Sequence, residues 1–238
     1  MLKQIEFILS YIKLGFLFPI LHKFYEVTGI IDTKWYEYSE KIFKKYLNYS
    51  FNDKTNNKIS EKSTIVLTNH RSAGDMFVDF EHIPNICVII RTLATISGGF
   101  YTIFRSFTDS IIVIDRSNTK RKELIKTVKD RLIMRYNVMW FPEGTRSNYL
   151  EYTKNDMEER IKWGLLKSVW ENGLKYQIVI TEGKENVCNE RKMEFNYNLI
   201  LNRAIGGEID SAKFETFDDF KDVFKEEWVK LWRLAYNT

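Results

Sequence analysis

One histidine and one aspartate stand five positions apart in the segment 69–75, directly after the apolar run 65–67. The apolar run predicts a buried strand, and the polar residues after it predict a turn. An imidazole beside a carboxylate is the minimum arrangement for general-base catalysis on a hydroxyl, because the carboxylate selects the ring tautomer and stabilises the charged ring. His70 and Asp75 are therefore the candidate catalytic pair, although a purely structural pair looks the same in sequence.

A second polar cluster follows another apolar run, where Asp115 and Arg116 stand side by side. The guanidinium of arginine is the side chain best suited to a bidentate grip on phosphate. A local ion pair explains the same two residues equally well, so both interpretations stay open.

The third cluster is the segment 141–147, which reads Phe-Pro-Glu-Gly-Thr-Arg-Ser. Pro142 ends an apolar strand, and Gly144 gives the backbone the freedom that a tight turn needs. The exposed amides of such a turn, with the Thr145 hydroxyl and the Arg146 guanidinium, can hold an anionic group. Glutamate and arginine are costly to bury without partners, which argues against a packing role for this segment.

Strand-like and helix-like patterns alternate after residue 63, which predicts an α/β domain with a mixed, largely parallel central sheet flanked by helices. In such sheets, chemistry gathers at the carboxyl ends of the strands, and the three polar clusters fall there. We expect strands at 64–68, 86–91, 110–115, 137–141, 176–180 and 195–201, and helices at 121–134, at 157–171 and from residue 214 onward.

The N-terminal part of the chain predicts a helical, membrane-associating segment over residues 1–50, ahead of a catalytic domain over 51–238. Residues 5–21 show one narrow polar stripe at helical spacing on an otherwise apolar helix. A membrane span needs roughly 20 mostly apolar residues, which this stretch does not provide. We therefore favour a helix in the membrane interface over a core helix. The aromatic and lysine-rich stretch 35–47 suits either setting, and the polar run 52–62 predicts a surface loop.

The composition excludes several classes of protein. With 238 residues, 44% of them hydrophobic, the chain can form one substantial domain, and 29% charged residues rule out a polytopic membrane protein. The net charge of +4 gives no sign of nucleic-acid binding, but it suits an anionic membrane surface or a phosphate-bearing substrate. Cys87 and Cys188 are expected to be reduced thiols, and three histidines argue against a histidine-rich metal site.

Taken together, these clusters resemble the glycerophospholipid acyltransferase family, whose best-known members acylate lysophosphatidic acid or glycerol 3-phosphate. Three motifs of that family occur here in order: Asn-His-x4-Asp at 69–75, Ile-Asp-Arg at 114–116 and Phe-Pro-Glu-Gly-Thr-Arg at 141–146. A Lys-x-Gly element of the family fits at 162–164. The fourth motif, expected at 176–180, lacks its usual proline, which leaves the acceptor and acyl selectivity open.

The resemblance, which covers roughly residues 63–180, implies transfer of a fatty acyl group from an acyl thioester to a hydroxyl of a glycerol-phosphate acceptor. Lysophosphatidic acid is the expected acceptor. His70 would take the hydroxyl proton and Asp75 would orient the ring, without an acyl-enzyme. No metal or cofactor is expected beyond acyl-CoA or acyl carrier protein as co-substrate. The substrate-binding residues that the resemblance implies are Asn69, Arg71, Ser72, Arg116, Glu143, Gly144, Thr145 and Arg146.

The expected partners are a membrane lipid surface, a lysophospholipid or glycerol 3-phosphate, and the acyl thioester, with no nucleic acid. The resemblance also implies a peripheral membrane protein whose active site faces the cytoplasm. It leaves the oligomeric state open.

Several alternatives remain. The chain is either an acyltransferase or transacylase on another lysophospholipid, or a non-catalytic lipid-binding protein on the same scaffold. A metal enzyme built on His70, Asp75 and His82 is a further alternative. An α/β-hydrolase is excluded, because it needs a Gly-x-Ser-x-Gly elbow and a later histidine, and the last histidine here is His82.

Overall fold

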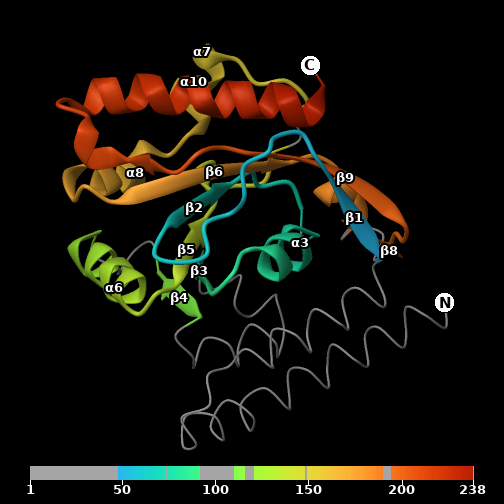
Figure 1. Ribbon diagram of the computed structural model, residues 1–238, viewed down its shortest axis with the longest axis horizontal. Helices are drawn as coiled ribbons and strands as arrows, with labels where there is room; N and C mark the ends of the chain where they lie inside the picture. Colours follow the sequence, from blue (N-terminus) through green and yellow to red (C-terminus); the bar gives the residue numbers. More distant parts are fainter. Residues whose placement is uncertain are drawn as a thin grey trace, which may run out of the picture.

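The computed structural model of this chain describes residues 48–72, 74–91, 110–115, 121–147, 149–189 and 194–237 (Figure 1). Helices cover both faces of a central sheet. The elements are, in chain order, β1 (Tyr49–Asp53), β2 (Ile65–Thr68), α3 (Gly74–His82), β3 (Ile86–Arg91), β4 (Ile111–Ile114), α6 (Arg121–Ile133), β5 (Asn137–Trp140), α7 (Lys154–Arg160), α8 (Trp163–Glu171), β6 (Lys175–Thr181), α9 (Lys184–Val187), β7 (Cys188–Asn189), β8 (Glu194–Phe195), β9 (Leu199–Ile205), β10 (Ile209–Asp210), η1 (Ser211–Lys213) and α10 (Phe217–Tyr236).

The strands of the main sheet lie in the order β1-β9-β6-β2-β5-β3-β4, and β10 pairs with β6. β2 pairs in parallel with both β5 and β6, and β3 pairs in parallel with both β4 and β5. Only two of the described pairings in this sheet are antiparallel, those of β6 with β9 and with β10. The prediction of a mixed, largely parallel sheet flanked by helices is therefore confirmed.

β2 lies near the middle of this sheet, and its sequence explains why. Ile65, Val66 and Leu67 form an uninterrupted apolar run, and all three side chains are fully buried. Such continuous runs are typical of parallel strands that helices cover on both faces. β5 is buried along its whole length in the same way. The turns that follow these strands therefore leave the sheet close together at its carboxyl edge.

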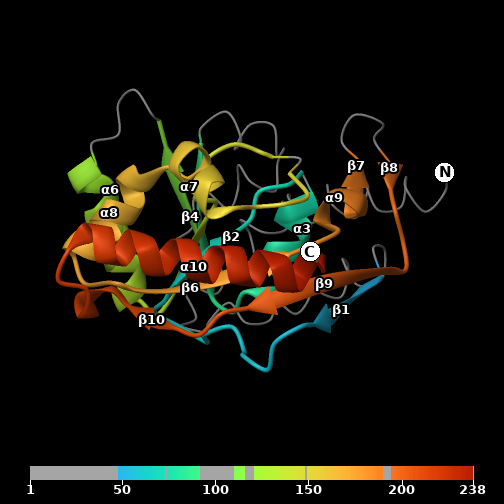
Figure 2. The same cartoon turned by 90° about the horizontal axis from the view of Figure 1, so that it is seen from above.

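The C-terminal helix α10 covers one face of the sheet, lying along β6 and β9 (Figure 2). Phe220, Phe224, Trp228 and Trp232 recur every four residues on this helix and are fully buried. This spacing places large aromatic side chains on one stripe, which faces the sheet. The helix begins with a capping box at Thr216.

The predicted strands at 64–68, 86–91, 110–115, 137–141 and 176–180 are all present as β2 to β6 within one or two residues. The predicted helix at 121–134 is α6. The helix predicted at 157–171 is wrong as one unit, because the extended backbone at Ile161 divides it into α7 and α8. The amide of Lys162 donates to the Pro142 carbonyl at 2.9 Å, so this break ties the helices to the turn after β5.

Two further differences concern the far end of the sheet. The strand predicted at 195–201 is two strands, β8 and β9, and Asn198 between them has a left-handed backbone with φ of 57°. The polar run 52–62 is not a loop throughout, because Asn52 and Asp53 complete β1. Their polar side chains are accommodated at the sheet edge, where Asp53 pairs with Arg203 at 2.7 Å.

The membrane-associating segment expected at residues 1–50 lies outside the described residues, apart from its last three positions. Its role and the division of the chain into domains stay predictions. No helix in the described part of the chain is long and apolar enough to cross a membrane.

Candidate active site

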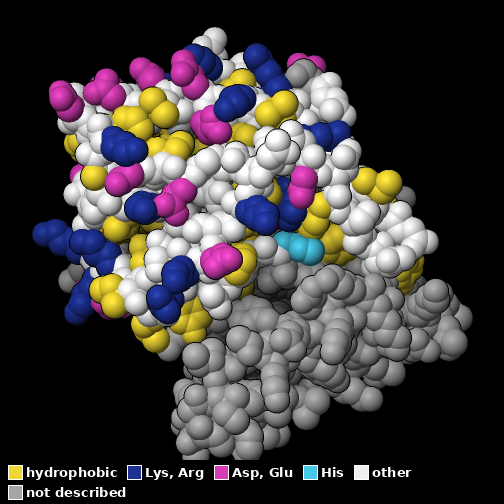
Figure 3. Space-filling view, viewed as in Figure 1, with side chains coloured by type: hydrophobic (Ala, Val, Ile, Leu, Met, Phe, Trp, Pro, Cys, Tyr) yellow, Lys and Arg dark blue, Asp and Glu magenta, His cyan; other side chains and the backbone are white. Residues whose placement is uncertain are grey.

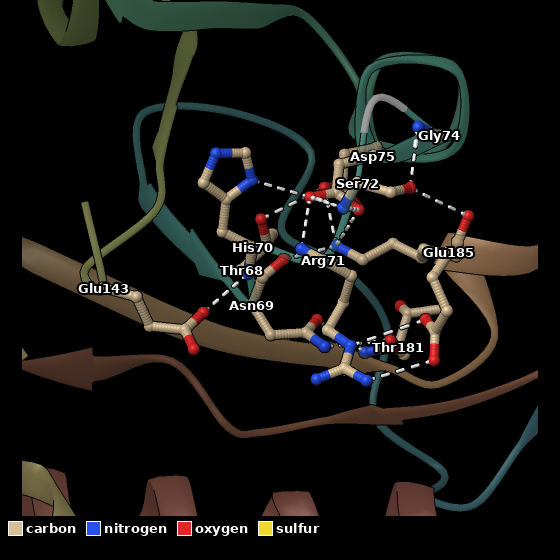
Figure 4. Close-up of polar contacts among 12 residues, drawn as sticks. Thr68, Asn69, His70, Arg71, Ser72, Gly74, Asp75, Glu143, Thr181 and Glu185 are labelled. Carbon is tan, nitrogen blue, oxygen red and sulfur yellow. Dashed lines mark hydrogen bonds and ion pairs between the residues drawn. The ribbon is translucent and has the colours of Figure 1, made fainter. Parts of the chain in front are cut away.

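The predicted catalytic pair is formed at the carboxyl end of β2. His70 lies two residues after the strand, Asp75 lies in the first turn of α3, and His70 Nδ1 is 2.7 Å from Asp75 Oδ2 (Figure 4). Asp75 is 1% exposed, whereas the His70 side chain keeps 20% of its surface exposed. The imidazole also stacks on the ring of Phe141, with 4.1 Å between the ring centroids. Among the described residues, no group binds His70 Nε2, the nitrogen opposite Asp75.

The Asp75 carboxylate organises the whole turn around itself. It accepts hydrogen bonds from the backbone amides of Arg71 at 2.6 Å and Ser72 at 3.2 Å, in addition to the contact with His70. Burial alone would raise the pKa of Asp75, but the Lys184 cation and the bond to His70 outweigh it, so this pKa is lowered. An ionised Asp75 accepts a hydrogen bond from a protonated Nδ1, and this tautomer leaves the Nε2 lone pair available as a base.

The turn after β5 holds the His70 peptide from both sides. Glu143 Oε2 accepts from the His70 amide at 2.6 Å, and the Ser147 amide donates to the His70 carbonyl at 2.9 Å. The Ser147 hydroxyl donates to the other Glu143 oxygen at 2.7 Å. Burial raises the pKa of Glu143, although these bonds partly oppose it. Gly144 closes the turn with φ of 68°, a backbone conformation that favours glycine.

Beside this turn lies a hollow of about 180 Å³. Arg91, at the end of β3, donates to the carbonyl of Gly144, which stands between the lining residues Glu143 and Thr145, at 2.9 Å. The hollow is smaller than the roughly 300–1,000 Å³ of a typical small-molecule pocket, so it suits a polar headgroup better than a whole lipid. Its lining residues include three cations and are Glu143, Thr145, Arg146, Ser147, Tyr149, Glu159, Arg160 and Lys162.

Asn69 links the catalytic turn to two other elements. Its side-chain amide exchanges two hydrogen bonds with the backbone of Thr181, at 2.9 and 3.0 Å, as a neighbouring strand would. It also donates to the hydroxyl of Tyr236 at 3.3 Å, so the end of α10 reaches the site. Asn69 is fully buried, and these contacts are all to protein.

Arg71 and Ser72 are likewise buried and bound to protein. The Arg71 guanidinium pairs with Glu185 at 3.1 Å, donates to the Ser147 carbonyl at 2.9 Å and lies over the ring of Tyr236. The Ser72 hydroxyl accepts a hydrogen bond from the backbone amide of Gly74, the first residue of α3. Substrate contacts by Asn69, Arg71, Ser72 and Glu143 stay predictions, and the contacts described here give all four a role in shaping the turn.

The structure therefore brings the first and third sequence clusters together. Thr145 and Arg146 are exposed at the rim of the hollow, where a substrate can reach them. Arg116 lies outside the described residues, so its part in the site stays a prediction. Asp115, directly before it, is exposed after β4.

Sequence reasoning missed two buried charges of this site, Asp79 and Lys184. A signal was available for Asp79, which stands four residues after Asp75 and so shares its helix face. Lys184 gave no such signal, because a lysine in a polar stretch after a strand looks like a surface residue.

The position of His82 bears on the metal-enzyme alternative. His82 ends α3, whereas Asp75 lies in its first turn, and the helix rise separates these residues by about 10 Å. The His82 ring contacts the Tyr49 hydroxyl at 3.2 Å. In the described part of the chain, no three histidine, cysteine or acidic side chains are placed to bind one metal ion.

A sequence profile described as Acyltransferase matches residues 50–180, which is more than half of the chain. The chain therefore belongs to the acyltransferase family, and this membership places it among the O-acyltransferases.

A solved structure supports the fold assignment. The crystal structure of the 1-acyl-sn-glycerophosphate (LPA) acyltransferase PlsC from Thermotoga maritima aligns over 94% of this chain and 95% of that chain. The TM-score is 0.63 and the sequence identity is 16%, so the likeness shows a shared fold. A search of curated protein sequences finds no match to this chain.

Proposed function

We propose that this protein transfers a fatty acyl group from an acyl thioester to the free hydroxyl of a lysophospholipid, with lysophosphatidic acid as the preferred acceptor. The observation that carries the proposal is the bond between His70 Nδ1 and the buried Asp75, beside a hollow rimmed by Arg146. A binding protein has no use for an oriented base, which argues against the non-catalytic alternative. Similarity to an enzyme named as an LPA acyltransferase supports the choice of acceptor.

In the proposed reaction, His70 Nε2 takes the proton from the acceptor hydroxyl as its oxygen attacks the thioester carbonyl carbon. The carbon–sulfur bond then breaks, and the thiolate leaves with the proton that the imidazolium returns. Asp75 stabilises the imidazolium between these two steps. Ser72 takes no covalent part, because its hydroxyl caps the start of α3.

Replacing His70 by alanine should lower turnover about 10²- to 10⁴-fold, the usual contribution of a positioned general base. Mass spectrometry of the products from a panel of lysophospholipids, glycerol 3-phosphate and acyl-CoA donors measures both this loss and the acceptor preference. His82→Gln is the matched control and should keep wild-type turnover. Substantial activity of the His70→Ala protein would exclude the mechanism, and a preferred acceptor without a phosphate monoester would exclude lysophosphatidic acid.

We further propose that the hollow beside the catalytic turn holds the acceptor phosphate. Arg146 and Lys162 supply positive charge there, and the Thr145 hydroxyl supplies a donor. Ser147 lines the same hollow and donates its amide to the His70 carbonyl, so the hollow adjoins the backbone of the catalytic turn. Glu159 in the same lining offsets part of this charge.

Replacing Arg146 by alanine should raise the Michaelis constant for lysophosphatidic acid about tenfold or more, while kcat changes little, because a charge-assisted bond to the phosphate is lost. Steady-state kinetics with varied acceptor at saturating acyl-CoA measure the effect. Arg233→Ala removes an exposed arginine of α10 and serves as the control. An unchanged Michaelis constant, or an equal loss with a neutral acceptor, would place the phosphate elsewhere.

We also propose that the protein works at an anionic membrane surface, with α6 facing the lipid. Residues 121–135 carry six lysine or arginine and two acidic side chains, a net charge of +4, which equals that of the whole chain. Ile133 and Met134, at the end of the helix, are 80% and 49% exposed. Figure 3 shows basic side chains gathered over α6, on the side of the molecule away from the acidic side chains of α10. The predicted apolar segment 1–50 would add to this attachment.

Reversing three α6 charges, with Lys122→Glu, Lys126→Glu and Lys129→Glu together, should weaken binding to anionic vesicles roughly 100-fold, at about 1 kcal/mol for each basic residue lost. Vesicle flotation of the full chain measures this binding. The matched control reverses the exposed Lys58, Lys62 and Lys213, which gives the same net charge. Equal binding by the two triple variants would contradict the assignment of this face.

A further inference from the structure

Lys184 is fully buried next to the catalytic turn, although no sequence motif includes it. It begins α9, after a two-residue turn that follows β6, and its ammonium donates to the Asn69 carbonyl at 2.7 Å and to Asp79 Oδ2 at 2.9 Å. The ammonium is also 3.9 Å from Asp75 Oδ1. Lysine is almost never fully buried unless it is paired, so these charges are what holds it there.

Asp79 is the second buried carboxylate of the cluster. It follows Asp75 by one helical turn, is 4% exposed and accepts from the Thr68 hydroxyl at 3.1 Å. Burial and the neighbouring Asp75 raise the pKa of Asp79 to about 6, although Lys184 opposes this rise. A carboxylate in this position adds negative charge to the surroundings of the catalytic pair.

The ammonium between the two carboxylates offsets their mutual repulsion. Burial would lower the pKa of Lys184, but Asp75 and Asp79 outweigh it, so this pKa is raised and the group stays charged. Because Lys184 also binds the carbonyl of the residue before His70, it fixes the backbone of the turn as well as its charge.

We infer that Lys184 is a positioning residue for the His70–Asp75 base, with Asp79 as its counter-ion. The inference rests on the proposed function, since it takes His70 as the base. Lys184 keeps Asp75 ionised and the turn in place. Asp79 leaves the cluster with a net negative charge, which favours the imidazolium formed when His70 takes a proton.

This arrangement predicts the direction in which each substitution shifts the pH dependence of activity. The Lys184 cation opposes the effect of burial on the pKa of Asp75, so removing Lys184 should keep Asp75 protonated, and the catalytic pair inactive, up to higher pH. Removing Asp79 has the opposite effect. The charged groups that face this cluster among the described residues are Asp75, Asp79, Lys184, Glu143, Arg71 and Glu185.

The test compares Lys184→Met, Asp79→Asn and the double variant in the full-length protein, with lysophosphatidic acid and acyl-CoA as substrates. It measures kcat, the acceptor Michaelis constant and the pH dependence of kcat/KM. Lys175→Met is the control, because Lys175, the first residue of β6, forms a solvent-accessible pair with Glu208. Circular dichroism gives the folded fraction of each variant.

Lys184→Met should lower kcat about 10- to 100-fold at an unchanged Michaelis constant. This range is usual for residues that orient a functional side chain without contacting the substrate themselves. Its acid limb of kcat/KM should move to higher pH, and that of Asp79→Asn should move to lower pH. The double variant restores the net charge of the cluster, so its limb should return to the wild-type position. If Lys184→Met does not fold, the double variant and Asp79→Asn still test whether Lys184 positions the base.

The inference would be overturned if the acid limb of kcat/KM in the variants lay at the wild-type position and activity fell only in proportion to the folded fraction. Lys184 would then be a structural residue. The proposed function fails on a different result, namely full activity of His70→Ala or no acyl transfer by the wild-type protein. The two failures are therefore distinguishable.

Discussion

The catalytic turn depends on one buried charge, the carboxylate of Asp75. With 1% of its surface exposed, it gains nothing from water and must be satisfied by protein groups. The amides of Arg71 and Ser72, the ring of His70 and the nearby ammonium of Lys184 provide this. Each of these interactions fixes part of the turn, so the cost of burying one carboxylate is offset by contacts that also orient the base.

The parallel sheet supplies the remaining constraint, because β2, β5 and β6 end at one edge and each contributes a turn there. Asn69 binds the end of β6, and Glu143 binds the amide of His70 from the end of β5. The C-terminal helix completes the arrangement, since Tyr236 in its last turn contacts Asn69. A helix that the sequence indicates only as a packing element therefore also supports the site.

Much of this arrangement could be predicted from sequence, for identifiable reasons. Continuous apolar runs indicate buried parallel strands, and the spacing of His70, Asp75 and Glu143 after such strands indicates chemistry at their ends. The break at Ile161 could not be predicted, because it depends on a hydrogen bond to the turn after β5. The role of Lys184 could not be predicted either, because its burial depends on which turns meet at the sheet edge.

The proposed mechanism requires that His70 presents an unprotonated Nε2, because Nδ1 carries the proton and donates it in a hydrogen bond to Asp75. Nitrogen-15 NMR of histidine-labelled protein measures this tautomer directly, and the chain has only three histidines to assign, with His70→Ala identifying the relevant signals. At a pH where the protein is active, the account predicts a protonated Nδ1 and a bare Nε2 for His70. A protonated Nε2 with a bare Nδ1 would contradict it.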